Sequence, residues 1–197
     1  MLAEYRKNAS VPPQRGLMLR RIAYDYLVLK DDLTEWFDIS VDSGFDFIDA
    51  PISGGQAGAE NGLLSIMCGG DKLAFNKAKP ILEIYSKICK RIGESGAGQK
   101  TKMCNQIAIA GLVQGLSEAL HFAEKAGLDG RDVVEVISQG AAGSWQMENR
   151  YETMLDNDFD HGFAVDWMRK DLSICFNEAK KNGASLPVTK IVDKYYE

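Results

Sequence analysis

Gly93-Glu-Ser-Gly-Ala-Gly-Gln-Lys-Thr-Lys-Met-Cys-Asn-Gln106, with the apolar run that follows it to Ala126, decides the fold of this chain. The glycine-rich turn leads into a long helix, because apolar residues recur three and four positions apart from Met103 to Leu120. Apolar residues also occupy most of the remaining circumference, and such helices are usually covered by protein on all sides. We therefore expect this helix to be the central spine of a helical domain.

Polar side chains stand near the start of that helix. The amides of Asn105 and Gln106 follow Lys102 by three and four positions, which places them on the same face as its ammonium, whereas Lys100 points to a largely different face. An ammonium and two amides at the wet end of a buried helix can hold an anionic substrate or move a proton. A lone lysine in a first turn is more often simply solvated, and the glycines and paired amides favour the functional interpretation.

Composition limits the alternatives. A chain of 197 residues allows one or two domains, and 45% hydrophobic residues are enough for a core. The net charge of −5 argues against nucleic-acid binding. The sequence has no membrane-spanning stretch and no signal-peptide core, so we expect a cytoplasmic protein, or a mitochondrial one if a transit peptide has been removed. Four scattered cysteines and two histidines predict reduced, packed thiols and no metal site.

The first half of the chain reads as a small α/β unit behind an uninformative start. Residues 1–42 carry no glycine fingerprint, and a rough helical period within 17–36 predicts one or two helices. Strands are expected at 45–51, where Pro51 should end the strand, and at 63–68 and 88–92. Asp71 is expected to cap a helix between the last two strands.

The second half reads as helices separated by clear stop and start signals. Gly127 should end the long helix, and Asp129 and Ser144 should cap two further ones. Another helix stops at Asn182-Gly183, and Pro187 fits the first turn of the last.

The glycine-rich segment 53–62 follows a strand and could be mistaken for a phosphate-binding turn. We expect the next element to be a strand, however, so that no helix N-terminus would face a phosphate. In the functional interpretation, the Ser53 hydroxyl and the backbone N–H groups of Gly54 and Gly55 bind a carboxylate. In the alternative, this is only a flexible hairpin connection.

Several motifs, in this order, resemble the β-hydroxyacid dehydrogenase family over about residues 45–197. The substrate-loop signature of that family is similar to Asp49-Ala-Pro-Ile-Ser-Gly-Gly55 with Met67-Cys-Gly-Gly70, and its catalytic motif to Gly93-x-x-Gly-x-Gly-x-x-x-Lys102 with Asn105-Gln106. Landmarks of its helical domain resemble Gly143-Ser-Trp145, Asn149-Arg150, Gly162-Phe163 and Lys170-Asp171-Leu172. The nearest branch is 3-hydroxyisobutyrate dehydrogenase.

The resemblance implies an α/β remnant of a Rossmann domain followed by an all-α, 6-phosphogluconate-dehydrogenase-like C-terminal domain, mostly helical overall. We expect a divergent N-terminal segment at 1–42, the C-terminal part of a Rossmann-like domain at 43–95, and a helical substrate and dimerisation domain at 96–197. Family members begin with a strand and Gly-x-Gly-x-x-Gly, which this sequence lacks.

The resemblance also implies roles for individual residues. Lys102 would be the general acid/base, and Ser53, Gly54 and Gly55 would bind the substrate carboxylate, while Asn105 and Gln106 orient the substrate. The family often has asparagine where this chain has Gln106. On the cofactor side, the expected contacts are Phe163, Lys170 and Asp171.

The expected function is interconversion of a short 3-hydroxy acid and its semialdehyde, dependent on NAD or NADP, in a homo-oligomer that binds neither nucleic acid nor membrane. Glyoxylate and tartronate-semialdehyde reductases are neighbouring alternatives. The missing glycine fingerprint favours a further one, a non-catalytic helical assembly module that no longer binds nicotinamide.

Overall fold

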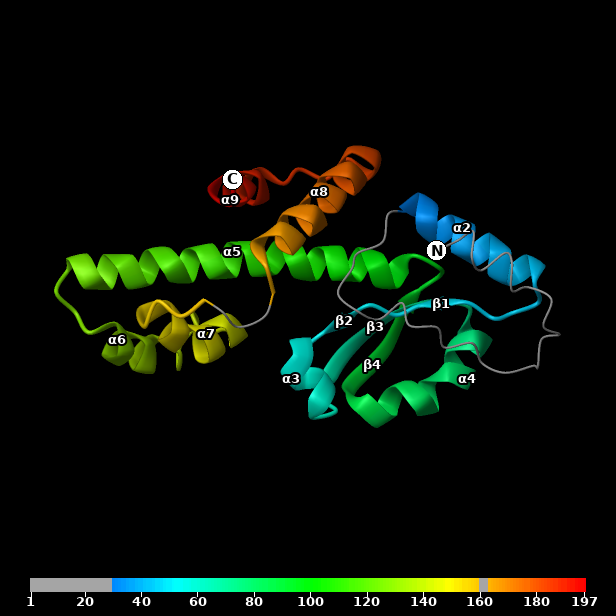
Figure 1. Cartoon of the computed structure of the whole chain (residues 1–197), viewed down its shortest axis with the longest axis horizontal. Coiled ribbons are helices and arrows are strands. Elements are labelled where there is room, and N and C mark those ends of the chain that lie inside the picture. The colour runs from blue at the N-terminus through cyan, green and yellow to red at the C-terminus, as the bar shows by residue number, and fades with distance from the viewer. Residues whose placement is uncertain (1–29, 160–162) are drawn as a thin grey trace.

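The computed structural model describes residues 30–159 and 163–197, so the expectations for residues 1–29 lie outside the described part. One long helix, α5, runs from one end of the molecule to the α/β unit at the other (Figure 1). A small α/β unit lies against its N-terminal half, and shorter helices pack along the rest (Figure 1). The elements in chain order are α2 (Lys30–Asp42), β1 (Ile48–Asp49), β2 (Ile52–Ser53), α3 (Gly55–Glu60), β3 (Leu64–Gly70), α4 (Lys72–Leu82), a 3₁₀ turn (Glu83–Tyr85), β4 (Ser86–Gly93), α5 (Ala97–Lys125), α6 (Gly130–Ile137), α7 (Trp145–Leu155), α8 (Val165–Asn182) and α9 (Pro187–Tyr195).

The sheet is built around β3. Strands β1 and β2 pair antiparallel with one edge of β3, and β4 pairs parallel with the other. The strand expected at 45–51 is shorter, at Ile48–Asp49, and ends before Pro51, but an unexpected second strand, β2, begins directly after the proline. Proline lacks only the N–H, and the Pro51 carbonyl still accepts a hydrogen bond from the Met67 N–H at 3.0 Å. The chain therefore stays beside β3 on both sides of the proline, in two short strands.

The strand expected after the glycine-rich segment 53–62 is present as β3, but the segment itself is not a simple loop, because residues 55–60 form the short helix α3. Gly54 and Gly55 have φ values of 129° and 60°, which turn the chain out of β2. Within α3, the side chain of Gln56 donates a hydrogen bond to the carboxylate of Glu60, one turn further on, at 2.7 Å.

The core of the α/β unit lies between the sheet and α4. As expected, Asp71 caps α4, and its carboxylate accepts from the N–H groups of Leu73 and Ala74. The buried apolar residues of this core are Leu64, Ile66, Cys68, Phe75, Ala78 and Leu82.

The helical part packs on two sides of α5. Leu116 and Leu120 contact α6 and α7, whereas Ala110 packs against α8 and α9. The local helix signals are confirmed: Asp129 and Ser144 cap α6 and α7, and α8 ends at a left-handed Gly183. Pro187 opens α9, and Gly127 follows the end of α5 with φ 74°.

The expectation that α5 is covered on all sides is wrong within the described residues. Residues spaced by four and three along one side remain exposed, and we call this side the uncovered face: Ala108, Leu112, Gly115, Ala119 and Phe122. The side chains of Leu112 and Phe122 are 45% and 72% exposed.

Within the part of the chain that the structure describes, no helix is long and apolar enough to cross a membrane.

Candidate functional site

The start of α5 is completed by a carboxylate from the sheet. Asp49, the last residue of β1, is 3% exposed. Its Oδ1 accepts a hydrogen bond from the Gly96 N–H at 2.7 Å, and its Oδ2 accepts from the Gln99 N–H at 2.9 Å. Gly96 is the N-cap of α5 and has a left-handed φ of 88°, so it has no side chain with which to satisfy these amides itself. Asp49 supplies that cap from a distant point in the sequence.

Gly98 allows the first turn of α5 to lie directly on the sheet. A Cβ at Gly98 would lie 2.7 Å from Asp49 Oδ2 and 2.8 Å from the Asp49 carbonyl, and closer still to the Met67 carbonyl. Gly69 makes the matching approach from β3, where a Cβ would lie 2.8 Å from the Ala97 nitrogen. The glycines at the start of α5 thus fix where the helix begins and how closely it lies on the sheet.

Lys102 follows one turn after Gly98 and is half-buried. Lys100, two residues earlier, is exposed and lies 3.9 Å from Glu178 of α8. The two lysines therefore stand in different environments, in agreement with the faces expected from helical spacing.

The predicted carboxylate-binding segment lies at the end of β2. Ser53 is half-buried and pairs with Ser65 of β3, whereas Gly54 and Gly55 are exposed. Met67, two residues further along β3 than Ser65, is the residue whose carbonyl faces Gly98. Helix α5 and the end of β2 therefore share β3 as their common support.

Four of the predicted site residues form one chain of polar contacts, two hydrogen bonds and an ion pair, between α5 and α8. Asn105 Nδ2 donates to Gln106 Oε1 at 2.9 Å, and Gln106 Nε2 donates to Asp171 Oδ2 at 2.7 Å. The other oxygen of Asp171, Oδ1, lies 2.9 Å from Lys170 Nζ. Gln106 and Asp171 are 2% and 0% exposed, so the chain runs through the protein interior.

The Asp171 charge also affects a neighbouring thiol. Burial raises the pKa of Cys175 to about 12, and the negative charge of Asp171 adds to the shift. The Cys175 thiol is therefore protonated at neutral pH.

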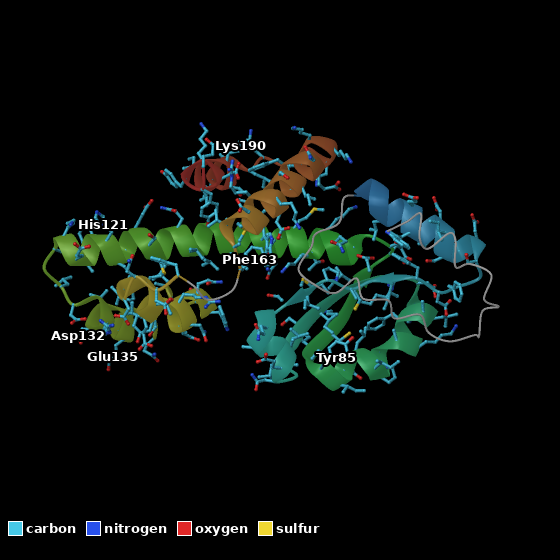
Figure 2. All side chains as sticks on the ribbon, viewed as in Figure 1. Tyr85, His121, Asp132, Glu135, Phe163 and Lys190 are labelled. Carbon is cyan, nitrogen blue, oxygen red and sulfur yellow. The ribbon has the colours of Figure 1, made fainter. Side chains whose placement is uncertain are left out.

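Phe163, on the connection from α7 to α8, lies close to the middle of α5 in the view of Figure 2. Its ring is 43% exposed and packs edge-on against Trp167, with centroids 5.7 Å apart. Gly162, its partner in the sequence motif, lies outside the described residues.

The structure therefore joins Asn105, Gln106, Lys170 and Asp171 directly. Lys102 stands on the same helix as the two amides, and the Ser53 segment is tied to the start of that helix through β3. Asp49 was missed as a site-building residue, although it opens the very motif that pointed to Ser53. No group of three or more metal-binding side chains occurs among the described residues.

Comparison with known proteins gives two family matches. Residues 96–197 match the model for the NAD-binding region of NADP-dependent 3-hydroxyisobutyrate dehydrogenase, and residues 31–93 match the NAD-binding domain of 6-phosphogluconate dehydrogenase. The second match begins inside α2, and the first begins at the N-cap of α5.

Individual relatives agree with these matches. An oxidoreductase from Shewanella frigidimarina is 61% identical over 150 residues, which are 76% of this chain and 52% of that protein. The 2-hydroxy-3-oxopropionate reductase of Escherichia coli is 41% identical over 74% of this chain and 50% of its own length. A solved structure of Mycobacterium tuberculosis 3-hydroxyisobutyrate dehydrogenase with L-serine superposes with a TM-score of 0.77 at 29% identity, covering 88% of this chain and 62% of that one. The chain spans about half the length of the curated relatives it matches.

Proposed function

The chain belongs to the β-hydroxyacid dehydrogenase family, and from this premise we propose that it carries the substrate-binding and proton-transfer side of an enzyme dependent on NAD or NADP. The enzyme interconverts a short 3-hydroxy acid, such as 3-hydroxyisobutyrate, and its semialdehyde. The observation that supports this most strongly is the buried link between Asn105, on the helix of Lys102, and Lys170 on α8.

In this proposal each polar group has a distinct task. The Ser53 hydroxyl and the N–H groups of Gly54 and Gly55 bind the substrate carboxylate. Lys102 accepts the hydroxyl proton during oxidation and returns it during reduction, as a general base and acid. Asn105 orients the reacting oxygen toward the Lys102 amine.

The nicotinamide supplies hydride acceptance or donation when bound. The residues present fit one side of such a cofactor: Lys170 brings a cation fixed by the buried Asp171, and Phe163 brings a partly exposed ring. The sequence contains no Gly-x-Gly-x-x-Gly turn for the pyrophosphate. We therefore propose that residues 43–95 are the C-terminal part of the cofactor-binding domain and that residues 96–197 form the substrate domain.

The direct test compares Lys102→Met with Lys100→Met. Both variants remove a lysine from the first turns of α5, but only Lys102 has the proposed role. Hydride transfer with 3-hydroxyisobutyrate and with L-serine is followed by nicotinamide absorbance, for each cofactor. The assay uses the chain alone and the chain fused to the part of the Shewanella frigidimarina relative that it does not match.

We expect Lys102→Met to lose activity about a hundredfold or more, in the range typical of a general acid/base, while Lys100→Met stays near wild type. Activity that survives in Lys102→Met would remove this residue from its role.

Two alternatives are separated by related measurements. The Escherichia coli relative favours a tartronate-semialdehyde substrate, which would be turned over faster than the methyl-bearing semialdehyde in the same assay. A non-catalytic assembly module would show no fluorescence change when the chain alone is titrated with NADH or NADPH, and no turnover in the fused form.

A further inference from the structure

We infer that Gln106 and Asp171 are positioning residues, which hold Asn105 by a hydrogen bond and Lys170 by an ion pair through one buried chain of polar contacts, and that Gln106 does not itself bind the substrate. This inference rests on the proposed function, because it assigns Asn105 to the substrate and Lys170 to the cofactor. It differs from the sequence-based expectation, in which both amides orient the substrate.

The direction of every hydrogen bond in the chain follows from Asp171. An ionised carboxylate only accepts, so Gln106 must turn its NH₂ group toward Asp171 Oδ2. The Gln106 carbonyl oxygen is then left facing Asn105, which must donate its own Nδ2–H. The orientation of each amide is thus dictated by the carboxylate.

Burial leaves Gln106 no surface for a ligand. Its side chain is 2% exposed, and its two polar atoms are occupied by Asp171 and Asn105. Asn105 is only half-buried, and the Lys170 side chain is 34% exposed although its ammonium nitrogen is buried, so the residues at the two ends of these contacts are more open than those in the middle. A residue at the middle acts through its neighbours.

The buried carboxylate of Asp171 has neighbours on both helices. From α8, Lys170 pairs with it, and the Cys175 thiol lies beside it in protonated form. Arg169 instead points toward the C-terminus, where it pairs with Asp193 and Glu197. From α5, the neutral amide of Gln106 is the group that meets the second carboxylate oxygen. Since a buried charge is stable only when paired and hydrogen-bonded, loss of that amide would disturb Lys170 as well as Asn105.

The test replaces the amide by a carboxyl group of nearly the same shape, in Gln106→Glu. At neutral pH the new carboxylate would face Asp171 Oδ2, and two buried like charges repel. When the pH falls, the new carboxyl takes up a proton and can donate to Asp171 as the amide did. Its pKa is raised in the folded state, so its stability contribution is present at low pH and lost as the pH rises.

The matched control is Gln114→Glu, which makes the same chemical change two turns later. Gln114 donates to Glu118 at 3.1 Å at the surface, where water screens the new charge. We expect the melting temperature of Gln106→Glu to lie well below wild type at pH 8 and to approach it near pH 5, while Gln114→Glu follows wild type throughout. A deficit in Gln106→Glu that does not depend on pH, or no deficit, overturns the inference.

The kinetic measurement separates positioning from substrate binding. In the active fused form, Gln106→Glu breaks the contacts between Asn105 and Lys170 and should raise KM for both the hydroxy acid and the nicotinamide. The rise should be about tenfold or more, as for loss of a hydrogen bond to a charged group. If Gln106 binds substrate, only the KM of the hydroxy acid rises. If every variant is inactive because the proposed function fails, the pH dependence of the melting temperature still tests whether Gln106 donates to Asp171 in the protein interior.

Discussion

The contact between α5 and the sheet makes a quantitative prediction at Gly98. Alanine normally stabilises a helix by about 0.5–1 kcal/mol relative to glycine. At Gly98, however, the added methyl would lie 2.7 Å from Asp49 Oδ2 and 2.8 Å from the Asp49 carbonyl, well inside contact distance. Forcing the helix away costs about 1–3 kcal/mol for overpacking and weakens the bond from the Gln99 N–H to Asp49 by about 1 kcal/mol.

The net expectation for Gly98→Ala is therefore a loss of about 1–3 kcal/mol in unfolding free energy. Gly115→Ala is the matched control on the same helix, because a Cβ there meets nothing within 4 Å. It should gain about 0.5–1 kcal/mol. In a chain of this size, 1 kcal/mol shifts the melting temperature by roughly 2–4 °C.

Urea denaturation followed by circular dichroism measures both variants, with the slope of the transition checked against wild type. The two substitutions must have opposite signs. If Gly98→Ala is neutral or stabilising, the helix does not lie on the sheet as closely as described. Because Gly115 lies on the uncovered face of α5, both variants are measured at a protein concentration at which the protein is monomeric.

Three further predictions concern the thiols and the uncovered face. Iodoacetamide labelling of the native protein, followed by peptide mass analysis, should modify the exposed Cys104 first and leave the buried Cys68 and Cys175 unlabelled. Rapid labelling of either buried thiol would contradict the packing described above. Because burial raises the pKa of Cys175 to about 12, the contribution of this thiol to stability is complete below the ordinary thiol pKa and is lost as the pH rises above that value. The loss is at most about 1.4 kcal/mol per pH unit. Cys175→Ala should therefore flatten the dependence of unfolding free energy on pH in the alkaline range, and an unchanged slope would refute this. The uncovered face of α5 should support self-association, so light scattering should report an oligomer for wild type and a smaller species for Phe122→Glu. The control Ile84→Glu changes a residue that is 78% exposed on the α/β unit and should leave the mass unchanged. Equal masses for all three proteins would exclude this face as the interface.

Features that depend on neighbours in the sequence were predicted well. The caps at Asp71, Asp129 and Ser144 follow from side chains within a few residues of the backbone groups they satisfy. Local chemistry is sufficient there, since a cap needs only the right residue at the right offset.

Features that depend on distant partners were missed. Helix α3 is six glycine- and alanine-rich residues, and Gly58 packs close to the Leu64 side chain, so its stability comes from tertiary contact rather than from periodicity. The burial of Gln106 depends on Asp171, which lies 65 positions away. The exposure of one side of α5 could not be read from its apolar sequence, because that sequence does not say which faces are covered within one chain.

The carboxylate of Asp49 has a consequence for where this protein can be divided. Residue 96 is a natural place to cut by family resemblance, yet such a cut would strip the first turn of α5 of an acceptor located 47 positions upstream. The helical segment expressed alone would begin with unsatisfied amides and fray toward Lys102. Family resemblance divides the chain into two parts at residue 96, but the two parts should unfold as one cooperative unit.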